Sequence, residues 1–285
     1  MLKLPDALDN LRGGDLVLGP LKQFKERADA VGLQTLLAGR VKAMVGKSTG
    51  TTVLAMIYKD GAVIAGDRRA TSGHTHEDDY VKVEETANSA MIACAGSVPY
   101  IQELVKNLKL WIEILEREQE APVYVNDQAG VLSAILRANF EYLQMLIYFL
   151  GYYAVPIMAG YDVFKNCGRV YEFDEAGGVE RDRNFVTAGS GGNFAKLILM
   201  DSWRGGMDAM EAARLAIRAI MRASYDIYTS SPLLAPPTVS IISESGILSL
   251  DEPQVLALSW KIYLEDLKRF GKKSHLDFFD PKEVK

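Results

Sequence analysis

The sequence predicts an α+β fold in which antiparallel sheets are packed against helices on their outer sides. Strand-like runs come in groups joined by turn glycines, and two runs with helical apolar spacing separate each group from the next. The order is strands, two helices, strands, two helices, strands and a last helix. Blocks of this kind, rather than strict alternation of strand and helix, favour a sandwich over a doubly wound parallel sheet.

The first convincing strands appear only after residue 50. The runs TVLAMIY (52–58) and AVIAG (62–66) are joined by Lys59-Asp60-Gly61, which predicts a hairpin, and VKVEE (81–85) with SAMIACAG (89–96) predicts another. Apolar residues at helical spacing then predict two helices. The predicted helices are 97–118, 128–150, 193–203, 207–228 and 253–270, and the remaining predicted strands are 155–161, 168–173, 177–181, 184–189, 237–243 and 246–250.

The charge pattern separates the amino-terminal segment from the rest of the chain. Residues 1–50 carry three more basic than acidic side chains, whereas residues 51–285 carry eight more acidic than basic ones. One short helix, near Leu21–Ala30, is predicted in the segment. We therefore expect a distinct leader (1–50), a main domain (51–250) and a carboxy-terminal helix with a polar tail (251–285).

Composition excludes several classes of protein. A net charge of -5 argues against nucleic-acid binding, and two cysteines cannot form a disulfide framework. Charged residues interrupt positions 1–20, so no secretory signal is predicted. The uncharged stretch 142–161 is long enough for a membrane span, but Gly151 and Pro156 divide it into the end of a helix and a buried strand. We expect a cytoplasmic protein that binds neither membrane nor nucleic acid.

Common catalytic arrangements are also absent. No nucleophile elbow accompanies the three histidines. His74 and His76 with the acidic residues after them could hold a metal, but a solvated polar loop is favoured because no second ligand cluster exists. The stretch Gly189-Ser-Gly-Gly192 stands between a strand and a helix without the lysine of a nucleotide-binding loop. We expect no metal and no cofactor.

A threonine nucleophile remains. Cleavage between Gly50 and Thr51 would create an α-amino group next to the Thr51 hydroxyl. An α-amine has a pKa of about 7.7–8, so it can act as the base near neutral pH. The leader would then mask the amine, and Thr51 would begin a strand that holds it rigidly.

Six segments in this order resemble the β-subunits of proteasomes over about residues 50–250. The resemblance implies the N-terminal-nucleophile hydrolase fold, a four-layer αββα sandwich of two antiparallel sheets between helical layers. It also implies a threonine-type endopeptidase that removes its own leader. The segments are Gly50-Thr51-Thr52, AGDRRAT (65–71), Lys82-Val83, Ala95-Gly96-Ser97, Gly189-Ser190-Gly191 and Asp226-Ile-Tyr-Thr229.

The resemblance assigns a role to each matching residue. Thr51 would be the nucleophile and, through its amine, the base. Asp67 would pair with Lys82, although the loop before Lys82 is one residue short and leaves Lys59 as an alternative. The Gly96 N–H would form the oxyanion hole and Thr71 would contact the substrate backbone. Ser190, Asp226 and Thr229 would orient the amine, and the pocket for the residue before the scissile bond would comprise Ala70, Tyr80, Glu84, Cys94 and Val98.

Apolar members of that pocket suggest apolar substrates, whereas Glu84 could admit basic ones. Cys94 is expected to be a buried packing residue. By resemblance, the partners are a seven-membered β ring stacked on a second β ring, α-type caps, an ATPase unfoldase and unfolded polypeptides. Two alternatives remain open, an HslV-type peptidase that works with a hexameric unfoldase and an inactive structural ring subunit.

Overall fold

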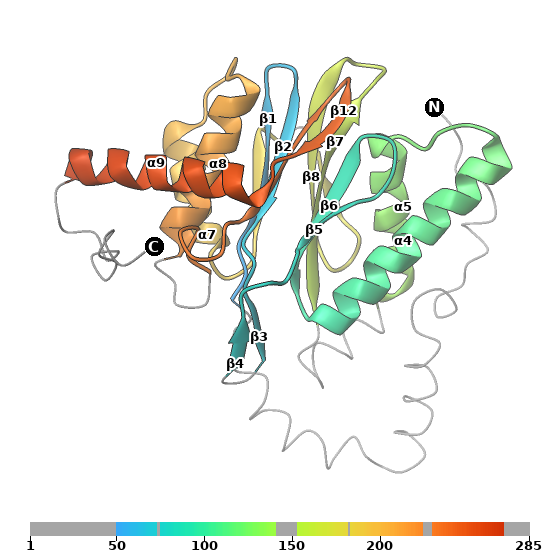
Figure 1. Ribbon diagram of the computed structural model, residues 1–285. Coiled ribbons are helices and arrows are strands. Elements are labelled where there is room, and N and C mark those ends of the chain that lie inside the picture. The colour runs from blue at the N-terminus through green and yellow to red at the C-terminus, as the bar shows by residue number, and fades with distance from the viewer. Residues whose placement is uncertain (1–49, 73–74, 141–152, 182, 225–229, 271–285) are drawn as a thin grey trace, which may run out of the picture.

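The computed structural model describes residues 50–72, 75–140, 153–181, 183–224 and 230–270. Within them, two five-stranded antiparallel sheets face each other (Figure 1). The first sheet has the strand order β10-β1-β2-β11-β12 and the second has β5-β6-β7-β8-β9. The first sheet consists of β1 (Val53–Tyr58), β2 (Gly61–Gly66), β10 (Phe185–Ala188), β11 (Thr238–Ser243) and β12 (Gly246–Ser249).

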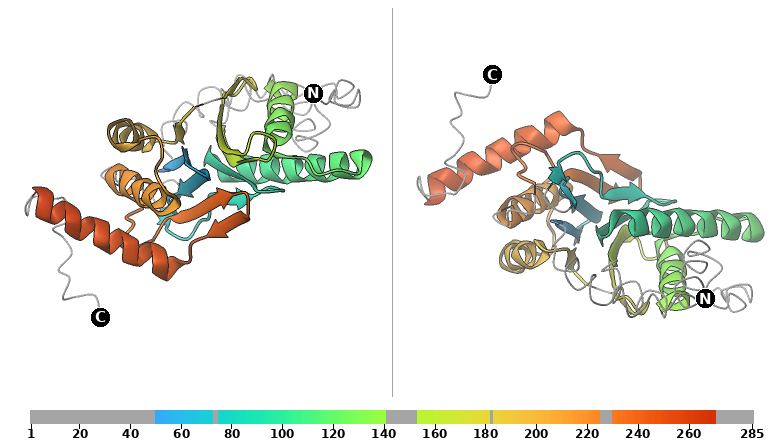
Figure 2. Two further views of the ribbon diagram at one scale, coloured as in Figure 1. Left: turned by 90° about the horizontal axis from the view of Figure 1, so that it is seen from above. Right: turned by 90° about the horizontal axis from the view of Figure 1, so that it is seen from below.

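Helices cover the outer face of each sheet, as the two end-on views show (Figure 2). Helices α4 (Val98–Gln119) and α5 (Val125–Ala138) pack on the second sheet, whereas α7 (Gly192–Ser202), α8 (Ala209–Ala223) and α9 (Glu252–Phe270) lie on the first. The second sheet consists of β5 (Val83–Glu85), β6 (Ala90–Gly96), β7 (Ala154–Asp162), β8 (Cys167–Phe173) and β9 (Val179–Glu180). This is the predicted four-layer αββα sandwich.

Three hydrophobic clusters correspond to the three interfaces between these layers. Side chains such as Ile64 and Ile157 fill the space between the sheets, because alternate strand residues point to that face. The opposite faces pack against helices, with Ile92 beneath α4 and α5 and Leu54 beneath α7 and α8. Cys94 is buried in the cluster under α4 and α5, as expected of a packing residue.

Two predicted helices differ from the structure at their ends. The helix predicted over 128–150 begins at Val125 as α5, which ends at Ala138; the Asn139 side-chain amide donates to the Ile135 carbonyl there, and helical structure resumes at Phe140. The helix predicted over 207–228 begins after Asp208, which forms a capping box with Glu211, and ends at Ala223. The continuations 141–150 and 225–228 lie outside the described residues.

The segment predicted as a polar loop around the histidines contains a small hairpin instead. Strands β3 (Ala70–Ser72) and β4 (Thr75–Glu77) pair antiparallel, which places His76 in a strand, while His74 lies outside the described residues. Each of these two strands has only three residues, and the polar sequence around them shows no alternation of apolar and polar residues. The predicted helix at 21–30 also lies outside the described part of the chain. No helix of the described residues is long and apolar enough to cross a membrane.

Candidate active site

Thr51 lies two residues before β1, rather than in the strand that it was expected to begin, and it contacts the loop between β10 and α7. Its N–H donates to the Ser190 hydroxyl (3.3 Å), and its carbonyl accepts from the Gly191 N–H (3.1 Å). Gly189 has a φ of 94°, and a Cβ there would lie 2.2 Å from the Thr51 carbonyl oxygen. Only glycine permits so close an approach. The loop therefore fixes the backbone of Thr51 from one side.

Asp67 lies beside Thr51 because β1 and β2 form a hairpin. The Asp67 N–H donates to the Thr52 carbonyl (3.0 Å), and the Thr52 N–H donates to the Asp67 Oδ1 (2.6 Å). Lys82 Nζ forms an ion pair with the same Oδ1 at 2.7 Å. The Asp67 side chain is fully buried and that of Lys82 is 3 % exposed. The structure thus selects Lys82 rather than Lys59, which lies in the turn at the other end of the hairpin.

Lys82 also reaches the peptide bond that precedes Thr51. Its ammonium donates to the Gly50 carbonyl oxygen at 3.2 Å, so one side chain joins the buried carboxylate to the Gly50–Thr51 peptide. Burial lowers the pKa of Lys82 below its ordinary value of 10.5, and the Asp67 carboxylate opposes that shift by favouring the charged form. A positive charge held here would polarise the Gly50 carbonyl and favour an ionised hydroxyl nearby.

The second oxygen of Asp67 is held by two backbone N–H groups to which the sequence analysis gave no role. Oδ2 accepts from the Arg69 N–H (3.0 Å) and the Ser230 N–H (3.3 Å). The buried Ser230 hydroxyl in turn accepts from the Arg68 N–H (3.0 Å). These bonds tie the segment after residue 229 to the segment after β2. The only signal in the sequence was that Ser230 directly follows the segment that ends at Thr229.

A bidentate ion pair flanks the Asp67–Lys82 pair. Arg69 Nε lies 2.6 Å from Asp78 Oδ1, and its terminal nitrogen lies 2.7 Å from Oδ2. The hydrogen bond with Asp78 raises the pKa of Arg69 above its ordinary value. The sequence interpretation placed Asp78 in a solvated loop, but the structure holds it partly buried against Arg69. Among the described residues there is no group of metal-ligating side chains.

Gly96 ends β6 with its N–H directed toward the same side as Lys82. The Cys94 N–H donates to the Lys82 carbonyl (3.4 Å), and the Ser97 N–H donates to the Tyr153 carbonyl (2.8 Å) on the opposite side. Because N–H directions alternate along a strand, the Gly96 N–H points past Lys82. Gly96 has a φ of 138°, and a Cβ there would lie 2.1 Å from the Tyr153 carbonyl oxygen. Its geometry therefore requires glycine and suits an oxyanion donor.

The structure brings together part of the predicted specificity pocket. Cys94 stands opposite Lys82, since its N–H donates to the Lys82 carbonyl, and Glu84 lies two residues after Lys82 in β5. Burial, and after it the charge of Glu84, raises the pKa values of Cys94 and Tyr80. Ala70 is partly buried in β3, and Val98 begins α4. Thr71 lies in β3, and nothing is described of its side chain, whereas Asp226 and Thr229 lie outside the described residues.

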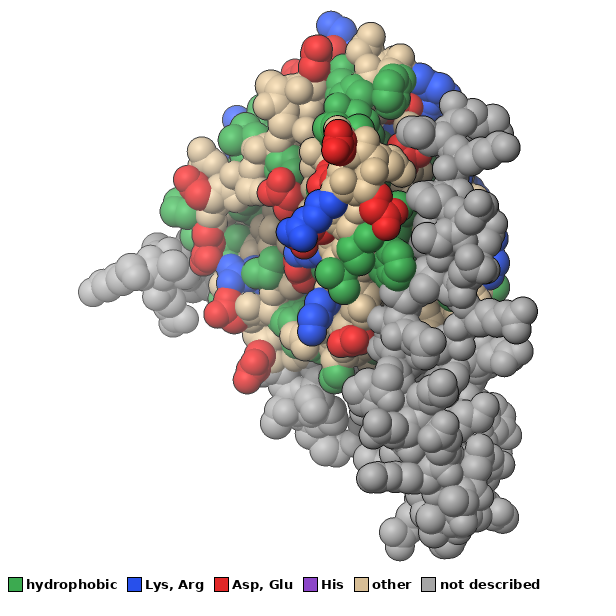
Figure 3. Space-filling view, turned by 90° about the vertical axis from the view of Figure 1, so that its right-hand side faces the viewer, with side chains coloured by type: hydrophobic (Ala, Val, Ile, Leu, Met, Phe, Trp, Pro, Cys, Tyr) green, Lys and Arg blue, Asp and Glu red, His purple; other side chains and the backbone are tan. Residues whose placement is uncertain are grey.

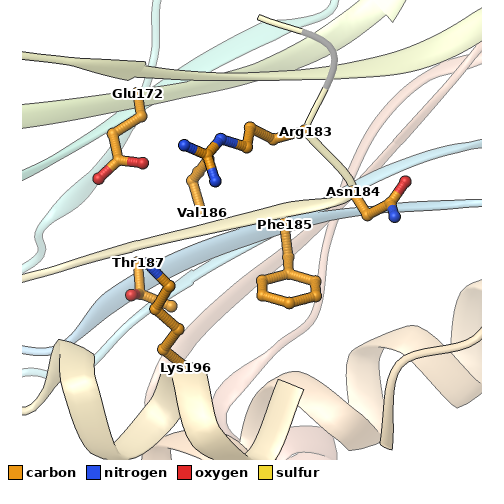
Figure 4. Close-up of a pocket in the computed structure, with 7 residues that line it drawn as sticks. All are labelled: Glu172, Arg183, Asn184, Phe185, Val186, Thr187 and Lys196. Atoms are coloured by element: carbon orange, nitrogen blue, oxygen red, sulfur yellow. The ribbon is translucent and has the colours of Figure 1, made fainter. Parts of the chain in front are cut away.

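A separate pocket of about 170 Å³ lies along β10 (Figure 4). The Arg183 and Glu172 side chains approach it from one side, and Lys196 reaches toward Thr187 from α7. None of its lining residues belongs to the predicted catalytic set. The arrangement around Thr51 is therefore the stronger candidate for chemistry.

The structure has two facing antiparallel sheets between helical layers, a threonine two residues before the inner strand β1, and a buried lysine–aspartate pair beside it. These features define the N-terminal-nucleophile hydrolase type of sandwich. Comparison with known proteins gives the family. A family model described as "Proteasome subunit" matches residues 47–233. The chain therefore belongs to the proteasome subunit family.

Similar proteins carry names that agree with this assignment. "Proteasome subunit beta 2" of Thermomonospora curvata is 34% identical over 215 residues, which is 74% of this chain and 75% of the relative. "Proteasome subunit beta 1" of Streptomyces avermitilis is 33% identical over 218 residues, with 74% and 75% covered. "Proteasome subunit beta" of Acidothermus cellulolyticus is 32% identical over 234 residues, with 77% and 79% covered.

Proposed function

We propose that this chain is a catalytic β-subunit of a proteasome core particle, a threonine-type endopeptidase that removes its own residues 1–50. The observation that carries the proposal is the position of Lys82 Nζ, 2.7 Å from Asp67 Oδ1 and 3.2 Å from the Gly50 carbonyl oxygen. A buried ammonium in that place can polarise the Gly50 carbonyl during leader removal. After the leader is cleaved, it can stabilise the ionised Thr51 hydroxyl.

Leader removal begins with the Thr51 hydroxyl, which lies in the residue that follows the Gly50 carbonyl. Attack forms an ester between the Thr51 Oγ1 and the Gly50 carbonyl carbon, while the Gly50–Thr51 amide bond breaks and the Thr51 nitrogen takes a proton. Lys82 polarises the carbonyl that is attacked. Water then hydrolyses the ester and releases the leader with a carboxylate on Gly50. The products are a free Thr51 hydroxyl and a free α-amine.

Peptide hydrolysis follows the same course on a bound substrate. The Thr51 amine, with a pKa of about 7.7–8, takes the hydroxyl proton as the oxygen attacks the substrate carbonyl. The positive charge of Lys82 stabilises the ionised oxygen, and the Gly96 N–H stabilises the oxyanion. The amine returns the proton to the leaving nitrogen, and water hydrolyses the resulting acyl ester.

Orientation of the amine is the task we assign to Ser190. Its hydroxyl accepts from the Thr51 N–H in the uncleaved chain, so it is in place to contact the amine that replaces this N–H. Asp226 and Thr229 receive the same task from the family resemblance. Thr71 is assigned to the substrate backbone on the same ground.

The proposals on assembly and location are carried over from the family resemblance. We propose seven-membered β rings stacked in pairs and capped by α-type subunits, an ATPase unfoldase that delivers unfolded polypeptides, and a cytoplasmic location. An HslV-type peptidase is the less favoured alternative because the similar proteins are named as proteasome β-subunits. An inactive structural subunit is disfavoured by the intact contacts among Gly50, Asp67 and Lys82.

The test is hydrolysis of fluorogenic peptides by the assembled particle. Wild-type particles should cleave such peptides, and Thr51→Ala particles should not. Thr51→Ser, which keeps a hydroxyl at the same place, should retain measurable turnover and is the matched control. Equal activity of wild type and Thr51→Ala would refute the assignment of the nucleophile.

A further inference from the structure

The residues around Lys82 form a surface against which the residue before the scissile bond would lie. In the uncleaved chain that residue is Gly50, whose carbonyl oxygen contacts Lys82 Nζ at 3.2 Å. Glu84 follows Val83 in β5, and because Val83 faces the other sheet, Glu84 points to the face that α4 covers. Tyr80 precedes Lys82 by two residues, and the charge of Glu84 raises its pKa after the larger effect of burial. Cys94 stands opposite Lys82 on β6, since its N–H donates to the Lys82 carbonyl. The P1 side chain of a substrate would therefore meet Tyr80, Glu84 and Cys94.

Glu84 is the charged member of this set, and it does not stand alone. Lys109, from the middle of α4, lies 2.8 Å from Glu84 Oε2. The two side chains are exposed to similar extents, 40% for Lys109 and 39% for Glu84. Tyr80 and Cys94 are uncharged at neutral pH, because burial and Glu84 both raise their pKa values. The net charge on this side of the pocket is thus decided by one ion pair.

On the side of the molecule seen in Figure 3, acidic and basic side chains are interspersed among hydrophobic ones over the part that is described. When a carboxylate and an ammonium are in contact, their electrostatic effects on a charged side chain nearby largely cancel. Either group alone would attract a substrate side chain of opposite charge. A basic substrate residue would have to compete with Lys109 for Glu84.

We propose that Lys109 determines substrate specificity by neutralising Glu84, so that the enzyme prefers an uncharged apolar P1 residue over arginine or lysine. The proposal rests on the proposed function and deepens it. It replaces the sequence interpretation in which Glu84 admits basic residues. Lys109 acts through Glu84 and takes no part in bond cleavage.

The experiment compares assembled particles on three fluorogenic tripeptides that differ only in P1: leucine, arginine or glutamate. Lys109→Met leaves Glu84 unpaired and should raise the ratio of kcat/KM for arginine over leucine about fivefold, which corresponds to about 1 kcal/mol, the upper range for a half-exposed pair. Glu84→Gln leaves Lys109 unpaired and should raise the glutamate-to-leucine ratio instead. The double variant should return both ratios to wild-type values.

Lys106→Met is the matched control, because it removes an exposed lysine from the same helix one turn earlier. It should leave both ratios unchanged. Leader removal is a separate readout of assembly and of the nucleophile in each variant. The bond that it cleaves follows Gly50, which has no side chain to enter the pocket. Unchanged ratios in processed Lys109→Met and Glu84→Gln particles would overturn the inference while leaving the proposed function standing. Absence of hydrolysis and of leader removal in the wild type would overturn the proposed function itself.

Discussion

Replacement of Asp67 by asparagine should separate the charge of this residue from its shape. Asp67 accepts four hydrogen bonds, from Lys82 Nζ and the Thr52 N–H on one oxygen and from the Arg69 and Ser230 N–H groups on the other. An asparagine can present its oxygen to only one of these pairs. Its amide then faces the other, and at least one buried N–H loses its acceptor, at a cost of about 1–3 kcal/mol.

Loss of the buried ion pair is more costly than loss of the hydrogen bond. Breaking such a pair by removing one partner costs about 3–5 kcal/mol. The cost has a ceiling, because Lys82 can instead lose its proton, which costs about 5 kcal/mol for a group with an ordinary pKa of 10.5 at pH 7. We therefore expect Asp67→Asn to lower the free energy of unfolding by about 4–8 kcal/mol. A neutral Lys82 would no longer favour the ionised Thr51 hydroxyl.

The assays are thermal unfolding, peptide hydrolysis and mass spectrometry of the leader. Asp67→Asn should unfold roughly 10 °C or more below the wild type, lose at least about a hundredfold in kcat/KM, and retain its leader. Asp60→Asn makes the same chemical change at an exposed position in the turn of the same hairpin and should stay within about 0.5 kcal/mol of the wild type. Wild-type activity in Asp67→Asn, with the same melting temperature as Asp60→Asn, would refute this account of the Asp67–Lys82 pair.

Three further predictions concern pH, backbone geometry and the last helix. The fall of kcat/KM at alkaline pH should begin below the ordinary lysine pKa of 10.5, because burial lowers the pKa of Lys82 and the charged form is the active one; a profile flat through pH 10.5 would contradict this. Gly96→Ala should retain the leader and lose at least about 1–3 kcal/mol of stability, because its Cβ would meet the Tyr153 carbonyl. Denaturant unfolding measures the loss, and normal leader removal in this variant would contradict the prediction. Glu265→Ala removes the carboxylate that holds Arg214 and Arg218 of α8 against α9, and should cost up to about 1 kcal/mol at low salt and less at high salt. An equal melting temperature of that variant and the wild type at low salt would show that the pair contributes nothing.

Much of this fold could be predicted because its elements carry strong periodic signals. The hairpin of β1 and β2 is marked by Lys59-Asp60-Gly61, and the long helix α4 shows its buried face at three- and four-residue spacing. The interruption after α5 and the end of α8 were missed because polar side chains, Asn139 and Ser224, bond to carbonyls of the last turn of each helix. Such competition with the helix depends on local geometry that hydrophobic spacing does not contain.

The candidate site, like the fold, could be predicted only in part from the sequence. Thr51, Asp67 and Lys82 could be proposed because each lies in a recognisable segment, and the structure brings Asp67 and Lys82 together next to Thr51. Ser230 donates to Asp67 through its backbone N–H. Every residue except proline has this group, so the residue type at position 230 does not indicate the contact. The pairing of Glu84 with Lys109 joins an edge strand to a helix 25 positions away, and only tertiary packing decides it. Roles predicted for Asp226 and Thr229 stay predictions.

The amino terminus of the subunit in purified, assembled particles tests the central claim most directly. Intact mass and amino-terminal sequencing should find a chain that begins at Thr51 and comprises residues 51–285, while Thr51→Ala particles should keep residue 50 and the leader before it. A wild-type chain that begins anywhere else would leave no α-amine beside the Thr51 hydroxyl, and would contradict the mechanism at its first step.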